Sequence, residues 1–128
     1  MLIPKEDAEQ QALVQWLKLQ KIDFFAPINE NVFSFLSRDI AIKLERKVKS
    51  MGKVKGVTDL VIFLPNKILF LELKRQPKKL KSGKISYANS KVSKEQEDFR
   101  DMVNKYSYTS HAIAYGWQDA RIIIEELI

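Results

Sequence analysis

"GVTDLVIFLPNKILFLELKR" occupies residues 56–75 and contains two apolar runs separated by Pro65-Asn66. Proline and asparagine are strong turn formers, so the stretch predicts a β-hairpin with strands at 57–64 and 67–74. Near-continuous apolar runs are typical of strands that are covered on both faces. This hairpin is therefore expected to lie in the centre of a sheet and to decide the fold around it.

Three charged residues stand at the end of the hairpin away from the turn, namely Asp59, Glu72 and Lys74. Side chains alternate between the faces of a strand, so Glu72 and Lys74 share a face. A two-residue loop pairs Leu64 with Lys67 and sets Asp59 opposite Glu72, whereas a three-residue loop shifts this register by one position. Opposed carboxylates repel each other, and a hard divalent cation such as Mg²⁺ or Mn²⁺ would neutralise them. The alternative is an edge hairpin whose charged ends are simply hydrated.

The rest of the chain alternates between helical and strand-like patterns. Apolar residues recur at helical spacing over 6–20, and Ser93 with Gln96 fits a capping box at the start of another helix. Residues 75–91 are polar and predict a long basic loop. The other predicted elements are a strand at 22–29 interrupted by Pro27, a helix in the second half of 30–50, a strand at 112–117 and a closing helix capped by Asp119. This order predicts one α/β domain, residues 1–128, with a mixed sheet.

Positive charge gathers on both sides of the predicted hairpin. The chain has 22 Lys+Arg against 16 Asp+Glu, which gives a formal net charge of +6. The basic residues concerned are Lys43, Arg46, Lys47, Lys49, Lys53 and Lys55 before the stretch, and Lys74, Arg75, Lys78, Lys79, Lys81 and Lys84 at its end and after it. Such runs attract polyanions by releasing counterions, although a solvated lysine-rich surface has the same composition. Their position beside an acidic cluster favours a nucleic-acid partner.

Several classes of protein are disfavoured by the remaining sequence. No stretch approaches the ~18 consecutive apolar residues of a membrane span, and the first residues lack the apolar segment of a signal peptide. The chain has no cysteine, so we expect a cytoplasmic protein without a membrane partner. "GKVKG" at 52–56 lacks the spacing of a phosphate-binding loop, so no nucleotide cofactor is expected. His111 is the single histidine, cannot form a two-histidine metal site and is expected to be a strand residue with a local hydrogen bond.

The ordered set "GVTDL", "LELKR" and "SKEQ" resembles the VRR-NUC branch of the PD-(D/E)xK nuclease superfamily. The resemblance covers nearly the whole chain through "EQQALVQWLK", "FFAPINE", "SMGKVKGVTDL" and "AIAYGWQDARIIIEEL". The sequence departs from the pattern at Thr58, where this branch usually has proline before the aspartate. Lys53 and Lys55 replace the arginines of the motif that names the branch, which keeps charge but loses bidentate phosphate geometry. The chain looks like a stand-alone VRR-NUC protein of the phage or bacterial kind.

This resemblance implies a restriction-endonuclease-like α/β fold, with a mixed central sheet flanked by helices in an αβββαβ order. It implies an endonuclease that hydrolyses DNA phosphodiester bonds with Mg²⁺ or Mn²⁺. Asp59, Glu72 and the backbone carbonyl of Leu73 would bind the metal. Lys74 would position or deprotonate the attacking water, and Gln96 would face the site from the next helix.

The resemblance also implies that the first helix adds an acid to this site. We choose Glu9 as a further metal ligand, because Leu13, Trp16 and Leu17 follow it at core spacing on one face. Glu6 lies one turn earlier on that face and stays open as the alternative. The residues expected to contact DNA are Lys53, Lys55, Arg75, Lys78 and Lys79.

Small free-standing members of this branch resemble four-way (Holliday) junction resolvases, which act as homodimers. The resemblance therefore implies a structure-selective nuclease acting on branched DNA in the cytoplasm of a bacterium or a phage-infected cell. Two alternatives stay open: a monomeric flap or nicking nuclease, and a catalytically idle DNA-binding module. The complete set of Asp59, Glu72 and Lys74 argues against the idle module, because binding alone has no use for clustered acids beside a phosphate.

Overall fold

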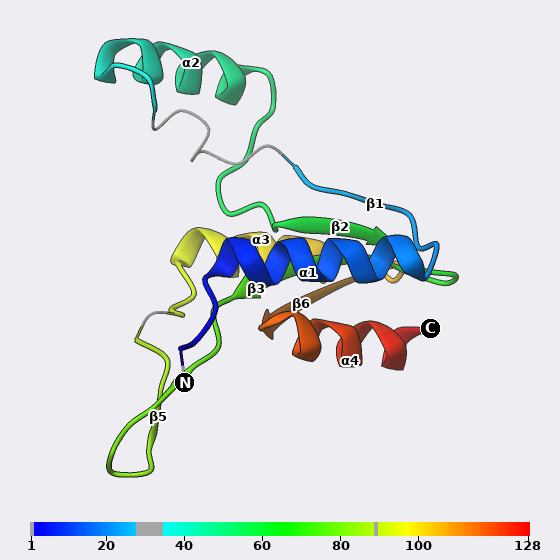
Figure 1. The fold of residues 1–128 in the computed structure, drawn as a ribbon. Helices are drawn as coiled ribbons and strands as arrows, with labels where there is room; N and C mark the ends of the chain where they lie inside the picture. Colours follow the sequence, from blue (N-terminus) through cyan, green and yellow to red (C-terminus); the bar gives the residue numbers. More distant parts are fainter. Residues whose placement is uncertain (1, 28–34, 89) are drawn as a thin grey trace.

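The computed structural model describes residues 2–27, 35–88 and 90–128, and its centre is a four-stranded sheet in the order β1-β2-β3-β6 (Figure 1). The strands are β1 (Phe24–Phe25), β2 (Leu60–Phe63), β3 (Ile68–Lys74) and β6 (Thr109–Tyr115). β1, β2 and β3 pair antiparallel, and β6 joins β3 in parallel. The sheet is therefore mixed, and with its flanking helices it confirms the predicted α/β class.

Helices cover the two faces of this sheet unequally. On one face α1 (Glu6–Leu19) and α4 (Trp117–Leu127) pack against each other and against β3 and β6. On the other face α3 (Lys94–Val103) places Phe99 against Phe70, with the ring centroids 5.7 Å apart. α2 (Arg38–Ser50) stands away from the sheet in Figure 1, and none of its thirteen residues, all of which the structure describes, is buried. No helix among the described residues is long and apolar enough to cross a membrane.

The alternation of side chains along β3 separates the core from the charged residues. The core consists of Leu13, Leu17, Leu60, Ile62, Leu64, Leu69, Leu71, Leu73, Ala114, Ala120 and Ile124. Glu72 and Lys74 alternate with the core leucines of β3 and so point to the face that carries α3. This second face is covered only in part, because Val61 is buried while Phe63 is 46% exposed. The expectation that both faces are fully covered therefore holds only near α3.

The turn of the hairpin has the two-residue loop, which settles the register. The backbone N–H of Leu64 donates to the carbonyl of Lys67 at 2.9 Å, and Leu60 pairs with Leu71. Counting one residue outward from that pair sets Asp59 opposite Glu72. The register predicted from the sequence is confirmed, and the three-residue loop is wrong.

Element boundaries differ from the prediction at the end of the chain. β6 begins at Thr109, three residues before the predicted start, and α4 begins at Trp117 with Gly116 as its N-cap. Asp119 is not the cap; its carboxylate lies inside the first turn and accepts a hydrogen bond from the N–H of Tyr115 at 2.9 Å. The helix predicted in the second half of 30–50 is confirmed by α2.

Two predicted segments have other outcomes. Within the predicted loop at 75–91 the chain forms a second, two-stranded sheet from β4 (Lys78–Lys79) and β5 (Ile85–Ser86). The predicted strand at 22–29 is seen as β1, and its residues 28–29 lie outside the described residues.

Candidate active site

Asp59 marks the point where the antiparallel ladder between β2 and β3 ends. Its Oδ2 accepts a hydrogen bond from the backbone N–H of Leu73 at 2.7 Å, where the ladder would otherwise continue. The N–H and C=O of one strand residue point to the same edge, so the carbonyl of Leu73 also faces the Asp59 side. The carbonyl of Lys74 faces the opposite edge, where it accepts the N–H of Gly116. Asp59 and the Leu73 carbonyl therefore lie at the same end of the sheet.

Glu72 is a buried acid, only 4% exposed, next to Asp59. Its Oε1 accepts a hydrogen bond from the side-chain amide of Gln96 at 2.8 Å, while its Oε2 is buried without a hydrogen-bond partner among the described residues. Burial, and after it the negative charge of Asp59, raises the pKa of Glu72 from 4.5 to about 8. Burial also raises the pKa of Asp59, although the Leu73 N–H opposes this rise. Burial and mutual repulsion thus destabilise the ionised form of both carboxylates, and a positive charge bound between them would stabilise it.

Lys74 is held over this pair by Gln96. The Lys74 ammonium donates to Gln96 Oε1 at 2.9 Å, and it lies 3.9 Å from Glu72 Oε1. Gln96 Oε1 also accepts the backbone N–H of Ser93 at 3.1 Å. These two donors fix the orientation of the amide, because a flipped amide would turn its NH₂ group toward the Lys74 ammonium. Gln96 therefore closes the predicted capping box of α3 and faces the acid pair at the same time.

The acid pair opens into a polar pocket of about 370 Å³. Its walls come from the first turns of α1 and α3 and from the segment that leads into β2. The lining residues are Glu6, Asp7, Gln10, Lys53, Val54, Lys55, Gly56, Val57, Asp59, Glu72, Lys74, Ser93, Glu95 and Gln96. The sequence did not point to Asp7, Gln10 or Glu95, which carry no motif of their own.

Gly56 brings the segment before β2 against the first turn of α3. Its φ is +81°, and a Cβ at this position would overlap the carbonyl group of Glu95 and lie 2.7 Å from the backbone N of Gln96. Only glycine permits this approach without strain. The close contact fixes the position of Gln96 relative to β2. It also fixes Gln96 relative to Asp59, which lies three residues after Gly56.

The structure does not place Glu9 beside the acid pair. Glu9 is buried, and its carboxylate accepts the backbone N–H of Trp117 at 2.8 Å and lies 3.4 Å from the amide nitrogen of Gln76. It therefore satisfies the N–H of the first residue of α4, and it does not line the pocket. Glu6 and Asp7 are the acids of α1 that line the pocket, and burial and the charge of Asp59 raise the pKa of Glu6.

The basic residues expected to contact DNA have different surroundings. Lys53 and Lys55 line the pocket. The guanidinium of Arg75 donates to the backbone carbonyls of Ile3 and Pro4, at 2.7 and 3.1 Å, and so ties β3 to the start of α1. Lys78 and Lys79 form the exposed strand β4.

His111 takes no part in this site. It lies in β6 beside Phe99, with the ring centroids 6.3 Å apart. Burial lowers its pKa, and neither ring nitrogen has a hydrogen-bond partner in the part of the chain that is described. The local hydrogen bond expected for it is therefore not present there.

The donor set of the pocket suits a small hard cation. The described residues contain no group of three or more His, Cys, Asp or Glu side chains placed to hold a metal ion. Mg²⁺ does not need such a cage, because it is commonly held by one or two carboxylates and keeps several waters. The Leu73 carbonyl and the carboxylates of Asp59 and Glu72, the latter with its Oε2 unpartnered among the described residues, fit that pattern.

Comparison with known proteins gives one finding that bears on the fold. No family model matches the sequence, and no curated protein matches it by sequence. Among solved structures, one titled "VRR_NUC domain protein" is similar with a TM-score of 0.71 and 20% sequence identity, over 100% of this chain and 91% of that one. At this identity the likeness concerns the fold. The chain thus has the fold of a VRR_NUC domain protein, which is the fold that its sequence motifs implied.

Proposed function

We propose that this protein is a VRR-NUC nuclease, a divalent-metal-dependent endonuclease that hydrolyses phosphodiester bonds in DNA. The observation that carries the proposal is the pair of half-buried Asp59 and buried Glu72, with one Glu72 oxygen unpartnered among the described residues and a lysine held beside it by Gln96. A pair of acids whose pKa values are raised by burial is costly to the fold. A bound cation would offset the free-energy cost of ionising the two carboxylates, and the pair would then serve as a metal site.

The chemistry divides between the metal and the chain. When bound, Mg²⁺ or Mn²⁺ would lower the pKa of a water and offset the negative charge that builds on the scissile phosphate. Asp59, Glu72 and the Leu73 carbonyl would hold it. Lys74, fixed by Gln96, would orient the attacking water as an ammonium, and only in its neutral amine form could it take up the proton of that water. Lys53 and Lys55, which also line the pocket, would hold the phosphate backbone.

We propose branched DNA, and four-way junctions in particular, as the substrate, with two copies of the chain cutting as a homodimer. Two strands of a junction must be cut symmetrically, and a two-fold dimer places two equal sites to do so. The likeness to a VRR_NUC domain protein supports the nuclease. The substrate and the dimer rest on the resemblance of the sequence to free-standing members of the branch.

The test is a cleavage assay on four-way junctions, flaps and linear duplex, each with Mg²⁺, Mn²⁺ or chelator. Paired, symmetric cuts in junctions with metal, and none with chelator, are expected. Cuts confined to flaps or nicks by a protein of monomeric mass would replace the resolvase with the monomeric nuclease. No cleavage of any substrate with either metal, together with salt-sensitive binding, would leave an idle DNA-binding module.

A further inference from the structure

The hairpin formed by β4, β5 and the turn between them, residues 78–86, is an element that the proposed chemistry does not use. Lys79 pairs with Ile85, and Lys78 with Ser86. The turn is closed by hydrogen bonds from the N–H of Leu80 to the carbonyl of Lys84 and from Gly83 to Leu80, with Gly83 at φ +85°. These features define a tight three-residue loop with glycine in the left-handed position. We call residues 78–86 the basic hairpin.

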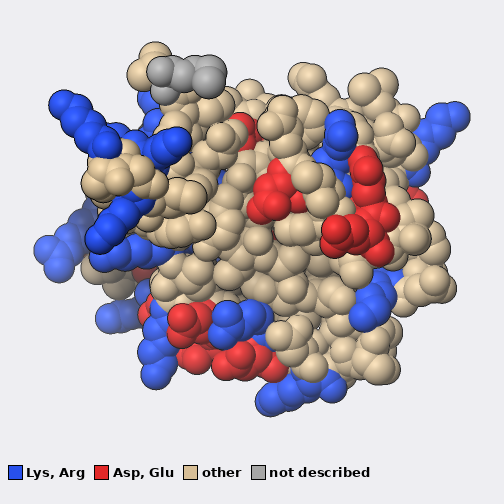
Figure 2. All heavy atoms as spheres, turned by 90° about the horizontal axis from the view of Figure 1, so that it is seen from below, with Lys and Arg blue, Asp and Glu red and all other residues tan. Residues whose placement is uncertain are grey.

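The basic hairpin carries positive charge on both of its faces and no acid. By strand alternation Lys78 and Lys84 lie on one face and Lys79 on the other, while Lys81 is in the turn. Each face also shows one apolar side chain, since Leu80 is 42% and Ile85 58% exposed. Lys and Arg side chains extend from the side of the molecule where this hairpin lies (Figure 2).

The base of the basic hairpin is fixed to the body next to the pocket. Arg75, which follows Lys74, donates to two carbonyls before α1, and the buried Ser90 donates to the Arg75 carbonyl at 2.6 Å. The rings of Tyr87 and Tyr115 meet edge to face, with centroids 5.1 Å apart. The hairpin therefore extends from a rigid root beside the candidate catalytic lysine.

We propose that the basic hairpin enters a groove of the DNA duplex that flanks the scissile phosphate, an inference that rests on the proposed nuclease function. The major groove of B-DNA, about 12 Å wide, admits a two-stranded β-ribbon. In that position the lysines of the two faces reach the phosphates on the two walls of the groove. Leu80 and Ile85 are covered there by base edges and sugars.

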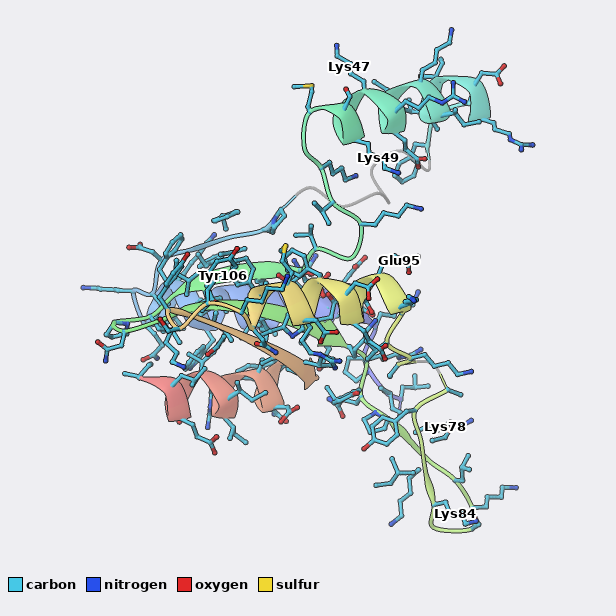
Figure 3. The ribbon with its side chains drawn as sticks, turned by 180° about the vertical axis from the view of Figure 1, so that it is seen from behind. Lys47, Lys49, Lys78, Lys84, Glu95 and Tyr106 are labelled. Atoms are coloured by element: carbon cyan, nitrogen blue, oxygen red, sulfur yellow. The ribbon has the colours of Figure 1, made fainter. Side chains whose placement is uncertain are left out.

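DNA is the occupant that the composition of the hairpin favours. A two-stranded ribbon is marginally stable alone, and four lysines without an acid repel one another until a polyanion covers them. A second copy of the chain would have to offer a matching acidic surface. In Figure 3 Lys78 and Lys84 lie on one side of Glu95, which lines the pocket, and Lys47 and Lys49 of α2 lie on the other. A duplex that reaches the pocket thus has basic elements on both sides.

The first test removes the charge of the basic hairpin. In a variant with Lys78, Lys79, Lys81 and Lys84 changed to Gln, the slope of log Kd against log salt for a linear duplex, measured in chelator, should fall by about 0.9 for each phosphate that a lysine no longer neutralises. The KM for cleavage should rise at least tenfold while the single-turnover rate at saturating DNA is kept. A control with four other lysines changed to Gln, Lys18, Lys21, Lys67 and Lys105, should keep the parent slope.

The second test locates the hairpin on the DNA. The chain has no cysteine, so Ser82→Cys gives one attachment site for an iron–EDTA group at the tip of the turn, and Asn66→Cys gives a control in the β2–β3 turn. The inference is supported if iron–EDTA attached at position 82 breaks both DNA strands across one groove, while iron–EDTA attached at position 66 does not. Breaks spread evenly along the DNA, or none from position 82, overturn it, as does an unchanged salt slope in the four-lysine variant.

The two tests separate this inference from the proposed function. If the parent protein binds and cuts DNA, and the hairpin variant has the same KM and the same slope of log Kd against log salt, the groove contact alone is refuted. Parent protein that binds DNA through the hairpin but cuts nothing with either metal refutes the nuclease alone.

Discussion

At the scale of residues, hydrogen bonds fix the orientation of each side chain in the candidate site, from Asp59 in the sheet to Ser93 at the start of α3. Asp59 is bonded to the Leu73 N–H, Glu72 to the Gln96 amide, and that amide to both Lys74 and the cap of α3. Within the described chain, one buried oxygen of this site has no hydrogen-bond partner, and it belongs to the Glu72 carboxylate. A cation is the group that such a site accepts most readily. The next two predictions follow from this network.

The Lys74→Ala variant should keep its affinity for DNA and for Mn²⁺ but lose cleavage by a factor on the order of 10²–10⁴, the usual contribution of a positioned proton-transfer group. Gln96 and Glu72 stay in place, so the fold should change little. Single-turnover cleavage beside a binding assay checks this. Lys67→Ala, in the β2–β3 turn, is the control, and a Lys74→Ala rate equal to the control rate would deny Lys74 a chemical role.

The stability of the metal-free protein should fall as pH rises from 4.5 to about 8. In this window the folded state keeps a proton on Glu72 that the unfolded chain has lost, so the free energy of unfolding falls by up to about 1.4 kcal/mol per pH unit. Denaturant unfolding in chelator should show this decline, and Glu72→Gln should reduce it. A Glu72→Gln profile that follows the parent would contradict the raised pKa of Glu72.

At the scale of elements, α1 and α3 direct their first turns toward the same end of the sheet, and glycine contacts hold these turns in place. Gly56 lets the segment before β2 touch α3, and Gly116 lets the start of α4 approach Glu9. Both glycines have positive φ and no room for a Cβ. The site is therefore shaped by backbone packing between elements as much as by its side chains.

Gly56→Ala should destabilise the protein by more than Gly52→Ala. Both positions have positive φ, which costs about 1–2 kcal/mol for alanine, but a Cβ at Gly52 meets nothing within 4 Å. The excess at Gly56 measures its overlap with the Glu95 carbonyl. Because Gln96 must shift as well, cleavage should fall in Gly56→Ala and stay at the parent rate in Gly52→Ala. Equal stabilities from paired denaturant titrations would contradict the close contact.

Glu9→Gln should lower the free energy of unfolding by about 1–3 kcal/mol, because the buried carboxylate that accepts the Trp117 N–H is replaced by a weaker acceptor. It should retain Mn²⁺ affinity when folded. Glu6→Gln should instead keep stability and reduce Mn²⁺ affinity, because Glu6 lines the pocket. Mn²⁺ titrations of both variants decide between them; loss of Mn²⁺ affinity in Glu9→Gln alone would restore Glu9 as the site acid.

The sequence predicted the hairpin and its register because both depend on local patterns, namely alternation along strands and the two-residue turn. It could not choose between Glu6 and Glu9, since both lie on one helical face and the choice depends on what packs against that face. The core spacing that favoured Glu9 did predict burial, but burial against α4. The boundary of α4 was missed because Gly116 replaces a side-chain cap with backbone freedom.

At the scale of the whole molecule, the pocket lies between two basic elements, α2 on one side and the basic hairpin on the other (Figure 3). The pocket holds the acid pair Asp59 and Glu72, and further lysines stand on the two basic elements beside it. This separation suits a polyanion that is attracted by the rim and meets the acid pair at one phosphate. Neither basic element could be placed from sequence alone, because both extend away from the core and no burial pattern marks their direction.

The central claim is that Asp59 and Glu72 hold one divalent ion beside Lys74. The most direct measurement is an anomalous difference map, at the manganese absorption edge, from crystals of the protein soaked in Mn²⁺. A peak between the two carboxylates and the Leu73 carbonyl, absent in Asp59→Asn, is the predicted result. Crystals of a protein shown to cleave DNA with Mn²⁺ that give no peak there, or a peak bound elsewhere, would contradict the account.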